Sequence, residues 1–526
     1  MTAFLEPAGS QRSADRLIPC SSLALSDVSM VCSPSRATLL SSRYAYNVGM
    51  DGNVLRAGDE RCLNVSTVGH QMHRSGVRTA YIGKYDVGYS SWACTPNCNG
   101  FEYFLGFYGP AQDCMPAPSP HSPGVAMPDA CRLRLVADYS HGVSPKSLDL
   151  HENREHAPQY RGEYSTTLFV RKAIDWIREK TQEVSSAGAG TFLYLATQAV
   201  HSPIDAPPGF WPGCSHITNE TRRTYCTIAM ALDEGIGNLT EAYKSLGLFD
   251  DTVFLFLSDN GGDNGYGGYN VPLRGQKGSL WEGGVRSQTF VHWSGFSAAQ
   301  KGSVWGGMAH AADWGVTLVA ALGHQATTLP REPAFDGFNL WPALVNGRAS
   351  PRTEMLLSMR DADDCSHGND PLCRFPGFLA YRKGPYKLIY GKPALSGALD
   401  FNGWGVPPNV GASRPAPDII GRNYAPLSSI YKWGGVLLFN IELDPLEEHD
   451  IRAGHESIVN EMVKALNIHN ASHIDQSSFH ASDVDDYEPC GVSELGLTCA
   501  TPWRGVKGSC QQHGEGRMEF AEWRGP

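Results

Sequence analysis

The chain has 526 residues, of which 41% are apolar and 10% aromatic, enough for a large core in two or three domains. Its 43 basic and 54 acidic residues give a formal net charge of -11 without a marked basic run, which argues against a nucleic-acid partner. The longest apolar runs, residues 191–200 and 253–257, are too short to cross a bilayer, so we expect no membrane span.

The first informative segment along the chain is a predicted helix start at Cys32. Pro34 suits the first turn of a helix, and residues 37–40 continue it. A cysteine at this place lies in the positive field of the helix N-terminus, beside the guanidinium of Arg36, and both favour a bound anion. The structural alternative is a buried or reactive cysteine at an ordinary helix start.

Three apolar segments, residues 78–83, 191–196 and 252–257, are predicted strands. Residues 165–184 and 227–246 carry apolar side chains at helical spacing. Apolar strands that alternate with amphipathic helices predict an α/β fold, with a parallel sheet covered on both faces.

Polar residues follow each of these strands. Lys84 comes directly after the first strand, His201 lies beyond the second, and Asp259 and Asn260 follow the third. Ligands of open α/β sheets bind outside the carboxyl ends of the strands, so we expect these side chains at one edge. Each also has a plain structural explanation: a turn, a loop histidine or a solvated lysine.

The last third of the chain predicts a smaller α+β unit. Residues 378–381 and 386–390 read as a hairpin, 436–441 as a strand, and the region around 458–466 as a helix. The expected organisation is an atypical segment at 1–31, a main domain at 32–349 and a smaller C-terminal domain at 350–526.

Cysteines and glycosylation sequons favour a secretory route, although residues 1–30 contain no apolar core of a signal peptide. The spacing of Cys94 and Cys98 loosely fits half of a zinc site, but no second His/Cys pair completes it. The sequons are at Asn64, Asn219, Asn238 and Asn470. Bridged surface loops are expected from the close pairs Cys94/Cys98, Cys114/Cys131, Cys214/Cys226 and Cys365/Cys373, with Cys490, Cys499 and Cys510 near the end.

Five motifs, in order, resemble those of the type I sulfatases, and most closely the arylsulfatase B-like (N-acetylgalactosamine-4-sulfatase-like) branch. The resemblance runs from about residue 31 to about residue 451. It implies an alkaline-phosphatase-like fold: a large, mostly parallel sheet between helices, with a smaller C-terminal domain. The motifs are Val31 to Arg43 around Cys-Ser-Pro-Ser-Arg, Tyr81-Ile-Gly-Lys-Tyr85, His201-Ser-Pro203, Ser258-Asp-Asn-Gly-Gly262, and Pro272 to Lys277 with Trp281 to Arg286.

The resemblance also implies roles for single residues. Cys32 would be oxidised to formylglycine, which acts as the nucleophile and a metal ligand. Arg36, Lys84 and Lys277 would neutralise the sulfate, and His201 would protonate the leaving oxygen or help release sulfate. Asp259 and Asn260 would hold one calcium ion through hard oxygen ligands. Asp86 stands where most sulfatases have histidine, and it could accept a hydrogen bond or act as a base.

The implied function is hydrolysis of sulfate esters, in sulfated sugars or polysaccharides or in aryl sulfates. A formylglycine-generating enzyme is the expected maturation partner, and the expected location is lysosomal or extracellular.

The sequence departs from the family before Cys32. The family's first core strand ends in an Asp-Asp pair that supplies the other calcium ligands, and no such pair occurs in residues 1–31. Asp15 and Asp27 lack an apolar strand before them, so neither is assigned to the metal. We therefore expect an N-terminally truncated chain with a weakened calcium site.

Two alternatives stay open. One is a non-catalytic, sulfatase-like protein that binds sulfated glycans and keeps Cys32 unmodified. The other is a phosphoester or phosphonate hydrolase on the same fold, which would use threonine or serine with two zinc ions. The Cys-x-Pro-x-Arg sequence and the lack of a His/Asp zinc set argue against this second alternative.

Overall fold

The computed structural model describes residues 22–51, 55, 61–110, 147–160, 163–184, 190–202, 204–207, 211–330, 332–360, 378–391, 393–394, 403, 405, 436–470 and 498–499. Its helices are α1 (Cys32–Ser41), α2 (Val68–Arg74), α3 (Ser165–Val184), α4 (Trp211–Cys214), α5 (Glu220–Ser245), α6 (Glu282–Val285), α7 (Ala311–Ala321), α8 (Trp341–Asn346) and α11 (Glu456–Asn470). Its strands are β1 (Ser22–Asp27), β2 (Arg78–Lys84), β3 (Tyr103–Phe107), β4 (Ser147–Leu148), β5 (His151–Glu152), β6 (Glu155–His156), β7 (Thr191–Ala196), β8 (Phe254–Leu257), β9 (Arg286–His292), β10 (Ser303–His310), β11 (Glu354–Arg360), β12 (Phe378–Lys383), β13 (Tyr386–Gly391), β14 (Val436–Asn440) and β15 (Thr498–Cys499).

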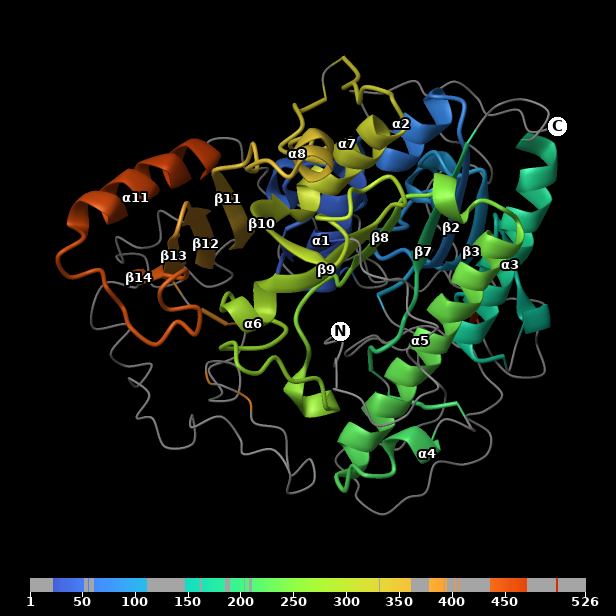
Figure 1. The fold of residues 1–526 in the computed structure, drawn as a ribbon, viewed down its shortest axis with the longest axis horizontal. Coiled ribbons are helices and arrows are strands. Elements are labelled where there is room, and N and C mark those ends of the chain that lie inside the picture. Colours follow the sequence, from blue (N-terminus) through green and yellow to red (C-terminus); the bar gives the residue numbers. More distant parts are fainter. Residues whose placement is uncertain are drawn as a thin grey trace.

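Two mixed sheets form the main part of the molecule (Figure 1). One has the order β6-β5-β3-β2-β7, in which β3, β2 and β7 are parallel. The other has the order β10-β1-β9-β8, in which β9 runs antiparallel to both of its neighbours. The expected α/β architecture is confirmed, but β2 and β7 belong to a different sheet from β8.

Helices cover both faces of the β2-containing sheet. Tyr81 of β2 packs in the cluster that contains residues of α1 and α2, whereas its neighbour Ile82 packs against Leu168 and Phe169 of α3. Successive side chains of a strand point to opposite faces, so this division shows a helical layer on each side. The predicted elements at 78–83, 165–184 and 191–196 are confirmed as β2, α3 and β7.

The expectation that no strand precedes Asp27 is wrong, because β1 ends at this residue and pairs with β9 and β10. Its six residues are too short and too polar to predict a strand without those partners, which come far later in the chain. The Asp27 carboxylate is buried and lies 3.2 Å from the Arg382 guanidinium. Burial raises the pKa of Asp27 to about 6.

The C-terminal unit is an antiparallel sheet, β11-β12-β13-β14, covered on one side by α11. The predicted hairpin is confirmed as β12 and β13, and the predicted helix lies within α11. Leu356 faces the cluster that contains α11, whereas Leu357 faces Trp281 of the main part. Successive side chains of this sheet are therefore buried in two different interfaces, one with α11 and one with the main part.

The disulfides agree in part with the expected pairs. Cys214 bonds to Cys226 as expected, but Cys94 bonds to Cys62 rather than to Cys98, which is itself disulfide-bonded. Cys94 and Cys98, whose spacing fits half of a zinc site, therefore have no free thiolate for a metal. The pairs Cys114/Cys131 and Cys365/Cys373, and Cys490 and Cys510, lie outside the described residues.

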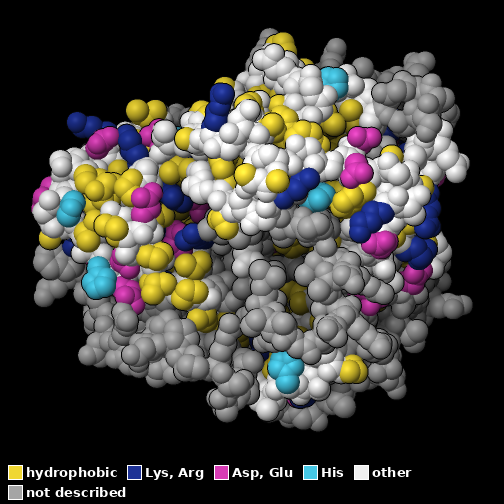
Figure 2. Space-filling view, viewed as in Figure 1, with side chains coloured by type: hydrophobic (Ala, Val, Ile, Leu, Met, Phe, Trp, Pro, Cys, Tyr) yellow, Lys and Arg dark blue, Asp and Glu magenta, His cyan; other side chains and the backbone are white. Residues whose placement is uncertain are grey.

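The described part of the chain has no helix long and apolar enough to cross a membrane. On the face that Figure 2 shows, basic side chains are interspersed with acidic ones among the residues described. The described residues of this face therefore form no extended basic patch of the kind that binds nucleic acid.

A buried charge cluster joins the C-terminal sheet to the main part. Lys387 of β13 lies 2.8 Å from a carboxylate oxygen of Glu282 in α6 and 2.8 Å from one of Glu447. Glu447 also accepts a 2.7 Å hydrogen bond from the backbone N–H of Glu282. All three side chains are fully or almost fully buried, so each charge depends on the others for compensation.

Glu447→Gln is expected to flatten the pH dependence of stability. Burial raises the pKa of Glu447 from 4.5 to about 7, although Lys387 lowers it. The folded protein therefore holds this proton more tightly than the unfolded chain does. The resulting stabilisation, at most ~3 kcal/mol, is full below about pH 4.5 and is lost as the pH rises through about 7.

Urea unfolding at about pH 5 and about pH 8 measures this effect. The wild type should lose more free energy of unfolding between the two pH values than Glu447→Gln does. Glu442→Gln, at an exposed position, is the matched control and should behave as the wild type. Equal losses in all three proteins would contradict the assignment to Glu447.

Candidate active site

Cys32 is the first residue of α1 and is completely buried. It is the one free cysteine among the residues that the structure describes. Its Sγ lies 3.4 Å from Oδ1 of Asn260, in the loop after β8. Lys277 also hydrogen-bonds to Cys32. Burial lowers the pKa of Lys277, but Cys32 and Asp259 together raise it above its usual value.

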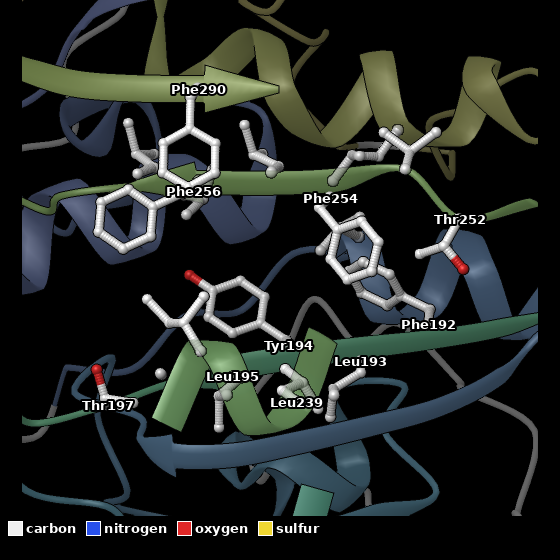
Figure 3. A pocket seen from close by; sticks show the side chains of 18 of the residues that line it. Phe192, Leu193, Tyr194, Leu195, Thr197, Leu239, Thr252, Phe254, Phe256 and Phe290 are labelled. Atoms are coloured by element: carbon white, nitrogen blue, oxygen red, sulfur yellow. The ribbon is translucent and has the colours of Figure 1, made fainter. Parts of the chain in front are cut away.

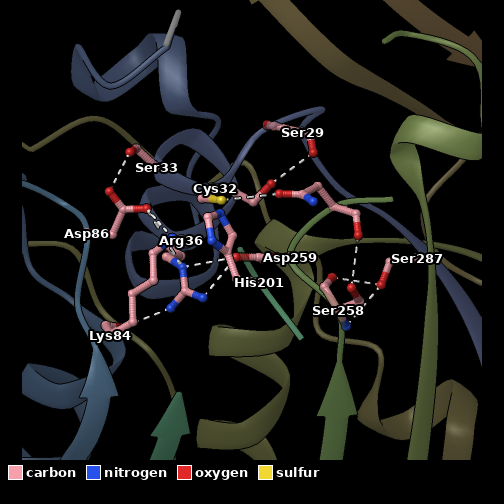
Figure 4. A network of polar contacts seen from close by, with 12 residues as sticks. Ser29, Cys32, Ser33, Arg36, Lys84, Asp86, His201, Ser258, Asp259 and Ser287 are labelled. Carbon is pink, nitrogen blue, oxygen red and sulfur yellow. Dashed lines mark hydrogen bonds and ion pairs between the residues drawn. The ribbon is translucent and has the colours of Figure 1, made fainter. Parts of the chain in front are cut away.

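Arg36 lies about one turn further along α1 and contacts the ends of two strands (Figure 4). Its Nε and Nη2 donate to Oδ2 of Asp259 at 3.1 and 2.8 Å, and its Nη1 donates to the Lys84 carbonyl at 2.8 Å. Burial raises the pKa of Asp259, but Arg36 and Lys84 more than reverse this, and the pKa falls well below the usual range. Asp259 is therefore ionised at any physiological pH.

Lys84 and Asp86 form a buried ion pair beside α1. Nζ of Lys84 lies 3.1 Å from Oδ2 of Asp86, and the Ser33 hydroxyl donates to Oδ1 at 2.7 Å. Asp86 has φ +56°, a left-handed conformation that aspartate tolerates better than most residues. Ser33 also accepts a hydrogen bond from the Leu55 backbone. Sequence analysis missed this role of Ser33, although the residue lies inside the recognised motif.

His201 and Lys277 meet in the same region, with 2.8 Å between Nε2 and Nζ. An ammonium group can only donate, so His201 accepts at Nε2, and Nδ1 carries the proton that it donates to the Ser202 carbonyl. Burial, followed by the charges of Lys277 and Lys84, lowers the pKa of His201 well below 6.5. The imidazole in this arrangement is neutral.

Close backbone contacts hold the loops that carry these residues. The N–H of Gly261 donates to Gly284, and the N–H of Lys277 donates to Gly262. The N–H of Gly278 donates to Met30, two residues before Cys32. A Cβ atom at Gly261 would lie 1.8 Å from the Gly283 carbonyl oxygen, so only glycine permits this approach. The motifs after β8 and around α6 therefore form one packed unit with the start of α1.

These residues surround a cavity of about 90 Å³. Such a cavity holds about three water-sized groups. The predicted site residues that line it are Arg36, Lys84, His201, Asp259, Asn260 and Lys277. Cys32 and Asp86 do not line it, but each contacts a residue that does. The structure thus brings the whole predicted set together, and basic side chains outnumber acidic ones.

Oxygen donors for a calcium ion are few in this site. Asp259 already pairs with Arg36, and Asn260 adds one neutral oxygen. Among the described residues, the one cluster of three or more His, Cys, Asp or Glu side chains close enough to share an ion is Asp444, Glu448 and His449. Calcium takes six to eight oxygen ligands, so the residues present do not make a complete calcium site.

Gly261→Ala is expected to destabilise the protein by about 3 kcal/mol or more, because the new methyl group would overlap the Gly283 carbonyl. Gly237→Ala in α5 is the matched control, since a Cβ there meets nothing within 4 Å. The control should be neutral or more stable by up to ~1 kcal/mol. Thermal unfolding compares the variants, and an unchanged transition in Gly261→Ala would contradict the packing described.

Lys277→Met is expected to raise the pKa of His201, because the charge of Lys277 is one of the causes that lower it. Lys277→Arg keeps the charge and should leave the pKa lower than Lys277→Met does. Histidine NMR titration, with His201→Gln to assign the signal, measures the shift without depending on activity. Identical titrations in the two lysine variants would exclude the contact between Lys277 and His201.

Comparison with known proteins agrees with this geometry. Mouse (Mus musculus) arylsulfatase J is 29% identical over 458 residues, which cover 84% of this chain and 69% of that protein. Human (Homo sapiens) arylsulfatase A is 27% identical over 396 residues, covering 73% and 68%. Human N-acetylgalactosamine-6-sulfatase is 25% identical over 335 residues, covering 61% and 58%. The arylsulfatase B-like branch stays a prediction.

Solved structures show the same fold. The structure of Ps i-CgsB in complex with k-i-k-neocarrahexaose has a TM-score of 0.65 at 23% identity and covers 88% of each chain. The PsFucS1 sulfatase from Pseudoalteromonas sp. has a TM-score of 0.56 at 19% identity, covering 87% of this chain and 83% of that one. The family model for sulfatases matches residues 21–324, more than half of the sequence. The chain therefore belongs to the sulfatase family.

Proposed function

We propose that this sulfatase hydrolyses sulfate esters of carbohydrates and that residue 32, oxidised from cysteine to formylglycine, is the nucleophile. The observation that carries this proposal is the grouping of Arg36, Lys84 and Lys277 around a small cavity beside the start of α1. A sulfate ester carries one negative charge, and charge moves onto the bridging oxygen as the S–O bond breaks. Three cations in a largely buried site stabilise that charge more strongly than water does.

The hydrate of formylglycine would supply one hydroxyl that displaces the alcohol from sulfur and a second whose loss of a proton lets sulfate leave. The contacts of residue 32 with Asn260 and Lys277 support a nucleophile at this position. Lys84 and Arg36 would bind the sulfate oxygens, and Asp86 would orient Lys84 through their ion pair.

His201 and Lys277 would share the proton transfers. Because His201 is neutral and accepts from Lys277, the ammonium of Lys277 is the better donor to the leaving oxygen. His201 would then orient that lysine and accept a proton during sulfate release. Of the two roles predicted for His201, this geometry favours the second.

Calcium is a separate part of the proposal. Asp259 and Asn260 would hold the ion, but only together with carboxylates from beyond the described residues, since the donors present are too few. We therefore derive no catalytic step through calcium. Weak metal binding would favour the alternative function, a sulfatase-like protein that binds sulfated glycans.

A secretory route is also proposed, with Cys32 oxidised by a formylglycine-generating enzyme. The disulfides Cys62–Cys94 and Cys214–Cys226 support an oxidising compartment. Two sequon asparagines, Asn64 and Asn238, are exposed. A third, Asn219, accepts a hydrogen bond as the N-cap of α5.

Cys32→Ala is expected to abolish sulfate-ester hydrolysis, because the variant cannot form the aldehyde. Peptide mass spectrometry of the wild type should show formylglycine at position 32. Assays with a sulfated oligosaccharide, an aryl sulfate and the matching phosphate ester then define the substrate class. The control is Ser35→Ala. Ser35 lies in the same helix turn as Cys32, but its side chain bonds to the Ser29 backbone, so this variant should keep activity.

An unmodified Cys32 together with binding of sulfated glycans would favour the non-catalytic alternative. Preference for the phosphate ester would favour the phosphoester hydrolase.

A further inference from the structure

Two aromatic side chains line the small active-site cavity, and neither takes part in the proposed hydrolysis. They are Tyr225 of α5 and Tyr266, the last residue of the short 3₁₀ helix Asn264–Tyr266. Tyr225 is buried, whereas Tyr266 is partly exposed. Because Tyr266 both lines the cavity and is reached by solvent, we place it at the mouth.

The size of this cavity determines which part of a substrate it can hold. Its volume is about 90 Å³, which is about the space of three water molecules. A sulfate group fills that space, and a sugar ring with its hydroxyls is too large to enter as well. The ring of a sulfated carbohydrate must therefore lie outside, at the mouth.

The position of the proposed proton donor indicates where that ring lies. Lys277 and its partner His201 line the small cavity, as Tyr266 does. A larger cavity, of about 610 Å³, lies between β7 and β8 (Figure 3), but neither Lys277 nor His201 lines it. The loop of Tyr266 begins at Gly262, whose carbonyl accepts a 3.0 Å hydrogen bond from the Lys277 N–H. The ring on the leaving oxygen is thus expected beside Tyr266.

Backbone hydrogen bonds hold the loop of Tyr266 in place without a ligand. The N–H of Tyr266 donates to the Asp263 carbonyl at 3.1 Å. Arg222 of α5 donates through Nη1 to the Gly267 carbonyl at 2.6 Å, directly after Tyr266. An aromatic ring fixed in this way loses little conformational freedom when a ligand packs against it, so the contact contributes to affinity.

We propose that Tyr266 is the specificity-determining residue for the leaving group, and that its ring stacks on the apolar face of the pyranose ring that carries the sulfate; this rests on the proposed function. A pyranose has a face of C–H groups and a rim of hydroxyls, whereas an aryl ring has no such rim. The cavity lining offers both kinds of contact, since polar Gln198, Ser202 and Asp263 line it in addition to the aromatic rings.

Binding measurements on the full chain test the proposal, with Cys32→Ala as the parent so that the probes are not hydrolysed. The sugar probes are the 4-sulfate and the 6-sulfate of N-acetylgalactosamine. Methyl sulfate carries the same charged group without a ring, and phenyl sulfate carries it on an aryl ring. Isothermal titration calorimetry gives each Kd, and its ratio to the Kd of methyl sulfate measures the contribution of the ring.

At least one sugar sulfate should bind about tenfold more tightly than methyl sulfate. Tyr266→Ala should remove most of this advantage and leave the affinity for methyl sulfate unchanged. Tyr266→Phe keeps the aromatic ring and should keep the advantage. Tyr269→Ala is the matched control, because Tyr269 is a partly exposed tyrosine of the same loop that does not line the cavity. This control should bind the sugar sulfate as the parent does.

A matching loss of affinity for methyl sulfate in Tyr266→Ala would overturn the proposal, because the substitution would then have disturbed the anion site. Loss of the advantage in Tyr266→Phe would replace stacking with a hydrogen bond of the hydroxyl. An advantage confined to phenyl sulfate would indicate an aryl subsite instead.

The outcomes also separate this proposal from the proposed function. Equal affinity for all the sulfate esters would refute the role of Tyr266 alone. Unmodified Cys32 without hydrolysis, together with the expected binding pattern, would refute the catalytic function and leave the sugar site in place.

Discussion

The buried guanidinium of Arg36 is the contact on which the site geometry depends. It bonds to Asp259, 223 positions later in the chain, and to the carbonyl of Lys84. Asp259 follows β8 and Lys84 ends β2, so one side chain joins strand ends of two different sheets. Loss of the Asp259 carboxylate would remove the nearest counter-charge of this buried guanidinium, which typically costs several kcal/mol. The contact that sets the relative position of the two sheets therefore also sets the shape of the anion site.

The same constraint explains why cations outnumber carboxylates in the small cavity. Asp259 pairs with Arg36, and Asp86 lies 3.1 Å from Lys84 and 4.0 Å from Arg36, while Lys277 meets neutral His201. An anion that enters this site meets the cations Arg36, Lys84 and Lys277 at close range, in surroundings that hold little water. A sulfate ester satisfies that charge, which is the physical basis of the proposed hydrolysis.

Two interfaces support the site from outside. The Lys387–Glu282–Glu447 cluster holds α6, and with it the glycine-rich loop against which Gly261 packs, to the C-terminal sheet. The second is the apolar cavity between β7 and β8, which shares Arg36 with the active site. The first interface is filled with compensated charge, whereas the second exposes strand edges. The side of the active site near α6 is therefore held more firmly than the side near β7 and β8.

Elements with local signals could be predicted from the amino-acid sequence: the helix start at Cys32, the strands β2 and β7, the helix α3 and the β12–β13 hairpin. Apolar periodicity and the residue types that start helices and turns act over a few residues, so they are readable without a structure. The motifs likewise predicted which polar residues gather, because parallel strands end at one edge. Four features could not be predicted in this way: the strand β1, the Cys62–Cys94 bond, the contact of Ser33 with Asp86 and the separation of β8 from β7. Each of these depends on partners that are distant in sequence, and no local pattern specifies which distant segments meet.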